Sequence, residues 1–253
     1  MAVTSSPSPA TDARANPFGW FLGRALLAGV AGGLAGAVFL WLVVEPVIRL
    51  ALEVEATRPA DAAGHAETFG RGVQVVGGML AAVLYGVLLA TIFGVVFMTI
   101  RHRMAVPTDF LRSLALAGCA FAAVGLVPAL KYPANPPAVG DPDTVGQRTV
   151  LYLILLAYGV VVVFAAWRWA GVLRARGTSQ PARVTLVGVA VVAVVGLAYA
   201  VLPPNPDAVP SDVPAEVLWR FRIASLAGLA VVWATIGLVF GWLCTVPGLR
   251  RRG

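Results

Sequence analysis

The sequence predicts an all-α, polytopic transmembrane helix bundle with six spans arranged as three helical hairpins and both termini in the cytoplasm. The first observation is composition: 59% of the 253 residues are hydrophobic, 12% are charged, and the mean hydropathy is +0.84. A soluble globule of this size needs more charge to cover its surface, whereas a lipid-facing surface needs little. The second and third observations are six long apolar runs and the arginines that lie between them.

The six apolar runs are long enough to cross a membrane core of about 30 Å, which takes about 20 helical residues. Residues 1–19 precede them and are rich in Ser, Pro and Ala without periodicity, which predicts a disordered cytoplasmic tail. The first run is too long for the apolar core of a signal peptide. A basic cytoplasmic tail is predicted over 247–253. The predicted spans cover about 20–44, 73–100, 111–130, 149–169, 182–202 and 221–244.

The arginines predict the orientation of these spans. If the N-terminus lies inside, the cytoplasmic pieces hold 12 of the 19 basic residues but only 2 of the 12 acidic residues. Positive charge is enriched on the cytoplasmic side of membrane proteins, so both termini are predicted to be cytoplasmic. The same orientation places three long loops outside, over 45–72, 131–148 and 203–220, and each loop joins the two helices of one predicted hairpin.

The second and third external loops resemble each other. PANPPAV at 133–139 aligns with PPNPDAV at 203–209, and each motif is followed by acidic residues and then by Arg148 or Arg220 at the entry of the next helix. The prolines of the second loop exclude a continuous helix there, so the chain forms a shaped loop between two spans. The pattern indicates a repeated hairpin.

The external loops also contain the residues best suited to bind a cation. Carboxylates together with an imidazole suit a divalent first-row metal. Glu45 stands at the border of an apolar span, where an ionised side chain needs a partner or water. The competing interpretation pairs Glu45 with Arg49 one helical turn on and leaves the other acids as a solvated surface. The candidate external metal ligands are Glu45, His65, Glu67, Asp141 and Asp143.

A second set of polar residues is predicted to shape or gate the outer mouth of the bundle. Asn135 can form a local turn before the proline that follows it. Arg148 can bond Asp141 or Asp143 and so hold its loop over the bundle. A purely structural role is the competing interpretation. The set comprises Arg71, Gln74, Asn135, Gln147 and Arg148.

An enzyme is not expected. The sequence has no GxxxxGK[ST] phosphate loop, no HExxH and no GxSxG, and its single lysine, Lys131, lies in an external loop. Nothing pairs a nucleophile with a base, and no permanently bound cofactor is predicted. Nucleic acid is not an expected partner, because the net charge of +7 comes from arginines at the ends of apolar runs. The lipid bilayer is the expected environment, and a homo-oligomer is left open.

Several stretches together resemble the CbtA family of bacterial membrane proteins. They are GRALLAGVAGGLAGAVF at 23–39, EP at 45–46, RGVQ at 71–74, LKYPANPPAVGDPDTVGQRT at 130–149 and LWRFRIASL at 218–226. The resemblance implies an inner-membrane subunit for the uptake of Co²⁺ in connection with cobalamin synthesis, often beside a small single-span, histidine-bearing subunit of the CbtB type. The family is usually described with five spans, whereas six are predicted here. The alternative function is a non-transporting membrane scaffold or accessory protein whose external proline-rich loops form a docking surface.

Overall fold

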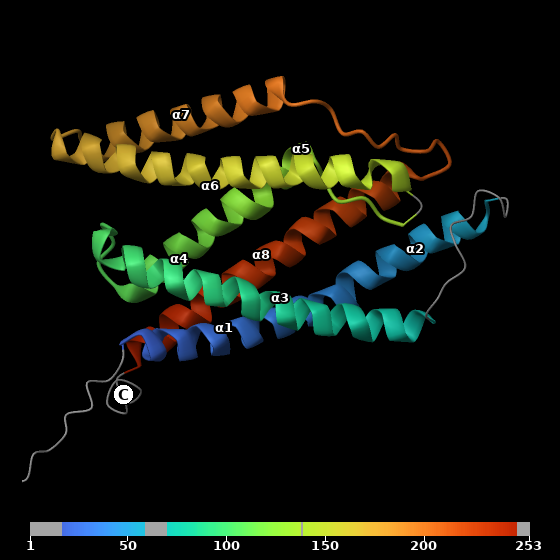
Figure 1. The fold of residues 1–253 in the computed structure, drawn as a ribbon, viewed down its shortest axis with the longest axis horizontal. Coiled ribbons are helices and arrows are strands. Elements are labelled where there is room, and N and C mark those ends of the chain that lie inside the picture. The colour runs from blue at the N-terminus through green and yellow to red at the C-terminus, as the bar shows by residue number, and fades with distance from the viewer. Residues whose placement is uncertain (1–16, 59–69, 138, 247–253) are drawn as a thin grey trace, which may run out of the picture.

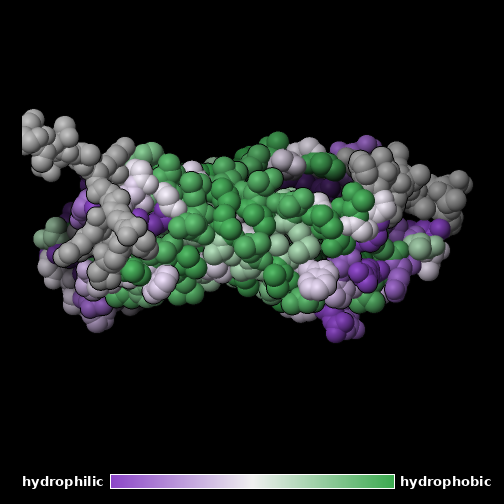
Figure 2. Space-filling model, turned by 90° about the horizontal axis from the view of Figure 1, so that it is seen from below, coloured by the Kyte–Doolittle hydropathy of each residue, from purple (hydrophilic) through white to green (hydrophobic). Residues whose placement is uncertain are grey.

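The computed structural model describes residues 17–58, 70–137 and 139–246, which form helices joined by loops and contain no strand (Figure 1). Within these residues, six helical segments are long and apolar enough to cross a membrane, as predicted. Figure 2 shows a band of hydrophobic residues around the middle of the visible face and polar residues gathered towards both ends. The fold is therefore that of a multi-pass membrane protein. The six segments are Phe18–Ala56, Arg71–Arg103, Asp109–Lys131, Val145–Ala175, Gln180–Val201 and Ala215–Thr245.

The first segment is longer than predicted, because the chain does not leave the helix at Glu45. Helix α1 (Pro17–Phe39) continues through a π-helical turn at Leu40–Val44 into α2 (Glu45–Ala56). Pro46 has no N–H to donate, and in a regular helix its ring would clash with the carbonyl four residues earlier. A wide π turn directly before the proline accommodates this defect without ending the helix. The helix therefore continues over Glu45–Ala56, into the stretch predicted as the first external loop.

The third segment is built in the same way. Helix α4 (Asp109–Ala120) passes through a π-helical turn at Phe121–Leu126 into α5 (Val127–Lys131). Pro128 follows this turn at the same offset at which Pro46 follows the first one. The α5 segment then stops at Lys131, where the proline-rich loop begins, as the sequence predicts.

The other four long helices cover the predicted apolar runs apart from Leu202, and each begins two to six residues before its run. They are α3 (Arg71–Ile100), α6 (Val145–Ala175), α7 (Gln180–Val201) and α8 (Ala215–Thr245). Two short 3₁₀ turns, Arg101–Arg103 and Pro142–Thr144, lie at the end of α3 and directly before α6. Of the predicted tails, residues 17–19 already belong to α1, whereas 1–16 and 247–253 lie outside the described residues.

The main core lies between α1, α3, α4 and α8, and glycines allow the helices to approach closely. A Cβ built on Gly33 of α1 would lie 2.6 Å from the Cα of Val83 on α3, so the two backbones are in direct contact. Aromatic rings fill the neighbouring space, with the ring of Phe240 5.0 Å from that of Phe97 and 5.3 Å from that of Phe93, centre to centre. Close helix packing thus explains the small-residue pattern of α1.

The helix contacts differ from the predicted pairing for the last two helices, because α7 and α8 do not form a major contact. Helix α1 packs against α3, and the segment from the second π turn to α5 packs against α6. Helix α7 instead lies along α6, while α8 crosses the bundle and packs against α1 and α4 (Figure 1). The start of α1 and the end of α8 lie together, because Arg24 Nε donates to the carbonyl of Leu243 at 3.0 Å. The opposite end, called the loop end here, carries residues 45–58, 132–144 and 202–214.

Candidate functional site

The two similar loops lie against each other at the loop end. The hydroxyl of Tyr132 donates to the carbonyl of Pro203 at 2.8 Å, and Asn135 Nδ2 donates to Asp207 Oδ2 at 2.8 Å. Lys131 Nζ adds a bond to the carbonyl of Tyr199 at 2.8 Å, which attaches the end of α5 to the end of α7. The sequence repeat therefore corresponds to two neighbouring loops that hold each other.

Asp207 is the residue on which this contact is centred. Its side chain is fully buried and accepts from Arg148 Nη1 at 2.7 Å and from Thr144 Oγ1 at 2.6 Å, besides the bond from Asn135. Arg222 Nη2 on α8 donates to Asn135 Oδ1 at 3.1 Å. The predicted bond of Arg148 to Asp141 or Asp143 is wrong, because the guanidinium reaches the buried carboxylate of the other loop. These five residues, Asn135, Thr144, Arg148, Asp207 and Arg222, are called the Asp207 network.

The network keeps Asp207 ionised. Burial by itself would raise the pKa of this carboxyl group, because a charged form is costly away from water. The hydrogen bond from Thr144, the positive charge of Arg148 and a backbone bond from Asp141 outweigh burial and hold the pKa below its ordinary value. Since both oxygens already receive bonds from the protein, this carboxylate is satisfied without a metal ion.

Asp141 and Asp143 lie beside the network and remain exposed. The backbone N–H of Asp143 donates to Asp141 Oδ1 at 2.9 Å, and Thr144 shares its single hydroxyl proton between Asp207 and the carbonyl oxygen of Asp141, which lies 2.7 Å from Thr144 Oγ1. Gly140 turns the chain before them with a φ of +124°, and a Cβ there would lie 3.0 Å from Arg148 Nη1. Among the described residues, no cationic side chain forms an ion pair with either aspartate. Two solvent-accessible carboxylates thus sit on a loop with a fixed backbone.

Glu45 has a different environment, because two arginines hold it. Arg49 Nε lies 3.1 Å from Glu45 Oε1, as the competing interpretation of the sequence predicts, and Arg71 Nε donates to the same oxygen at 3.1 Å. Arg71 Nη1 also donates to Gln74 Oε1 at 2.9 Å, so two predicted gating residues contact each other beside this carboxylate. The Glu45 side chain is only 6% exposed. An ion-paired, buried glutamate is a poor ligand for an incoming cation.

The remaining predicted residues are His65, Glu67 and Gln147. His65 and Glu67 lie outside the described residues, and Gln147 is exposed on the first turn of α6. In the part of the chain that the structure describes, no group of three or more His, Cys, Asp or Glu side chains is placed to hold a metal ion. Elsewhere at the loop end, Arg58 donates to Asp212 at 2.8 Å and 3.2 Å, which lowers the pKa of Asp212 and joins the turn after α2 to the third loop.

Sequence reasoning missed Asp207 and Arg222. Asp207 carried a visible signal, because it is the only charged residue inside either seven-residue motif and stands where the second loop has Pro137. An acid in place of a proline, in an otherwise similar motif, indicates a contact that the other copy does not make. Arg222 carried a weaker signal, as a charged residue at the second position of the predicted apolar span 221–244.

Comparison with known proteins agrees with this architecture. A family model described as probable cobalt transporter subunit (CbtA) matches residues 18–245, which include all six apolar helices and both proline-rich loops. No curated protein and no solved structure gives a significant match. The chain therefore belongs to the CbtA family of probable cobalt transporter subunits.

Proposed function

We propose that this chain is the integral membrane subunit of a Co²⁺ uptake system that serves cobalamin synthesis and resides in the bacterial cytoplasmic membrane. The observation that carries the proposal is the family match across all six apolar helices. The distribution of arginines supports an orientation with the loop end outside. In that orientation the proline-rich loops are the first part of the subunit that an incoming ion meets.

Asp141 and Asp143 are the proposed first contacts of Co²⁺. They are exposed, they are not neutralised by an arginine of the described chain, and the Asp207 network fixes the loop that carries them. His65 and Glu67 of the first external loop are proposed to add an imidazole and a further carboxylate, a donor set that suits a first-row divalent ion. Few and exposed ligands hold the ion weakly, and weak binding permits its release into the bundle. Glu45 is not part of this proposal, because Arg49 and Arg71 occupy it.

The membrane potential is the proposed driving force. The sequence contains no phosphate loop that would bind a nucleotide. A potential of 100 mV, negative inside, is worth about 2.3 kcal/mol for each elementary charge, and therefore about 4.6 kcal/mol for Co²⁺.

A small histidine-bearing, single-span subunit of the CbtB type is the proposed partner. Helix α7 packs along α6, and none of its residues is buried, so its outer face is free to contact a further membrane helix. That helix could belong to the proposed partner or to a second copy of the chain.

Cobalt-57 uptake by cells that lack other cobalt importers tests the function. We expect uptake to appear with the intact chain and its partner, and to fall by about tenfold in the D141N/D143N variant, because the outer loop then loses the charge that concentrates the cation. E53Q/E216Q is the matched control, since it removes two carboxylates from the same end without touching the Asp207 network. Equal uptake by both variants contradicts the role of Asp141 and Asp143. Uptake from neither variant nor the intact chain, at matched membrane levels, favours a non-transporting scaffold.

A further inference from the structure

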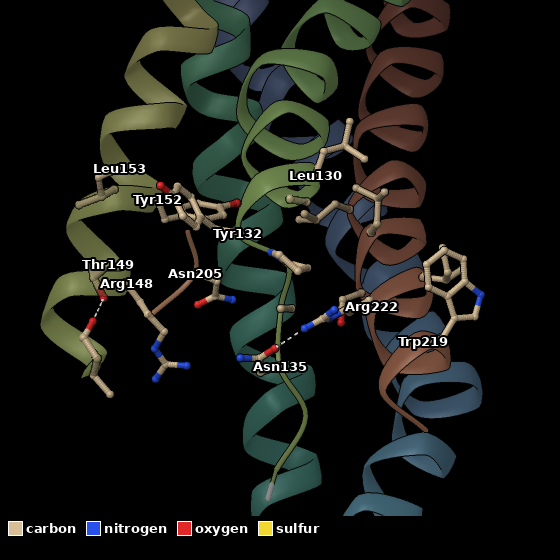
Figure 3. A pocket seen from close by; sticks show the side chains of 18 residues that line it. Leu130, Tyr132, Asn135, Arg148, Thr149, Tyr152, Leu153, Asn205, Trp219 and Arg222 are labelled. Atoms are coloured by element: carbon tan, nitrogen blue, oxygen red, sulfur yellow. Dashed lines mark hydrogen bonds between the residues drawn. The ribbon is translucent and has the colours of Figure 1, made fainter. Parts of the chain in front are cut away.

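A cavity of about 630 Å³ opens at the loop end between α5, the segment that follows it, α6 and α8 (Figure 3). Much of its wall is apolar and comes from side chains that are also exposed on the outside of the bundle. Leu130 is 63% exposed, Leu153 55%, Ile223 47% and Trp219 66%. Because these residues belong to apolar membrane-crossing helices or border them, the cavity opens sideways towards lipid.

The polar part of the wall is cationic. Arg148 and Arg222 both line the cavity, and no Asp or Glu does. Arg148 is neutralised by Asp207, but Arg222 donates only to the amide oxygen of Asn135 and has no carboxylate within 4.0 Å among the described residues. The Nε atoms of both arginines are buried and find no hydrogen-bond acceptor in the described chain. The cavity thus holds one uncompensated positive charge and two unused donors.

Such an arrangement favours the binding of an anion. A guanidinium inside an apolar span is costly unless a counter-ion or water meets it, and a buried N–H without an acceptor adds to that cost. Phosphate oxygens accept charge-assisted hydrogen bonds from arginine well. A divalent cation, in contrast, is repelled from a wall with arginines and no carboxylate. The cavity therefore lies off the proposed path of Co²⁺.

We propose that this cavity binds an anionic phospholipid, with its phosphate on Arg222 and Arg148 and its acyl chain along Leu130, Leu153 and Ile223. Free phosphate offers the same headgroup chemistry but makes no use of the apolar wall or of its opening towards lipid. The site is independent of the transport function proposed above. A lipid bound there contacts both α6 and α8 at the loop end, where the Asp207 network already joins the loops that precede these helices.

Lipid retention measured by native mass spectrometry of the purified full chain tests the site. After exchange into an equal mixture of phosphatidylglycerol and phosphatidylcholine, we expect one retained phosphatidylglycerol and a preference over phosphatidylcholine of about tenfold. Both lipids offer phosphate oxygens to the arginines, but the choline cation of phosphatidylcholine cancels its negative charge and is repelled by Arg222. R222Q should abolish this preference, and R222K should keep most of it. R220Q is the matched control, because Arg220 lies outside the cavity and pairs with Glu216 at 3.3 Å.

A second variant and a competition experiment complete the test. L226W fills the apolar part of the cavity and leaves both arginines in place, so it should lower phosphatidylglycerol retention even if R222Q does not fold. Equal retention of the two lipids by the intact chain, or unchanged preference in R222Q and L226W, overturns the proposal. Displacement of the retained lipid by millimolar inorganic phosphate also overturns it, since the cavity is then a site for a free anion.

Discussion

Replacing Gly86 by leucine is expected to prevent the stable association of α1 with α3, the two helices that form the centre of the bundle. A Cβ on Gly86 would lie 2.6 Å from the Cα and N atoms of Gly33 and 2.7 Å from the carbonyl oxygen of Gly29. These are backbone atoms, so no rotamer change relieves the overlap and the helices must separate. We expect a loss of more than about 3 kcal/mol in the free energy of unfolding.

Gly77→Leu is the matched control for this substitution. Gly77 lies on the same helix, and a Cβ there meets no atom within 4 Å. Equilibrium unfolding in mixtures of mild detergent and sodium dodecyl sulfate, with gel filtration to measure the folded fraction, compares the two variants. If G86L unfolds at the same denaturant fraction as G77L, the close contact of α1 and α3 is not the one that the structure shows.

Removing the carboxylate of Asp207 is expected to have the second largest effect on stability. The Asp207→Ala variant leaves Arg148, Thr144 and Asn135 without their shared acceptor in a buried site. Breaking one side of a buried ion pair leaves an uncompensated charge, and we expect a loss of about 2–4 kcal/mol because Arg148 is 31% exposed and retains some water. The same unfolding measurement checks this value. Removing Arg148 as well should cost less than the sum of the two single substitutions.

Asp212→Ala provides the control in the same loop. Asp212 also pairs with an arginine, but its side chain is 46% exposed, and exposed pairs contribute little. The contribution of Asp207 should also depend on pH in a defined direction. Because the folded pKa is lowered, the contribution is complete above the ordinary carboxyl pKa of about 4 and is lost as the pH falls through the folded value. If D207A is no less stable than D212A at pH 7, the network does not join the loops.

The sequence predicts the elements of this fold well, and the reason is local. Each span is a long apolar run, and the small-residue pattern of α1 already indicates close packing against a neighbour. The bond between Glu45 and Arg49 follows from helical spacing alone. The sequence does not predict that the first helix continues past Glu45, because a proline after an apolar run normally marks the end of a helix. The structure accommodates Pro46 in a continuous helix through the π turn at Leu40–Val44.

The candidate site is harder to predict, because it is made by contacts between distant residues. Arg148 has Asp141 and Asp143 close by in sequence, yet it pairs with Asp207, 59 positions away. The choice depends on burial: Asp207 is enclosed between two loops, whereas the two nearer aspartates face solvent. The packing of α8 on α1 and α4 rather than on α7 is likewise set by tertiary contacts. The repeat predicts that the loops are alike, but not that they touch.

Cobalt entry into proteoliposomes is the most direct test of the central claim, that this subunit moves Co²⁺ across the membrane. The purified chain, reconstituted with the proposed single-span partner under an inside-negative potential, should accumulate cobalt-57 above the level of protein-free vesicles. Accumulation should disappear when the potential is dissipated, because about 4.6 kcal/mol per Co²⁺ at 100 mV is the driving force. It should fall sharply in D141N/D143N but not in E53Q/E216Q. Cobalt entry no faster than in protein-free vesicles, with the partner present and the potential maintained, would contradict the account.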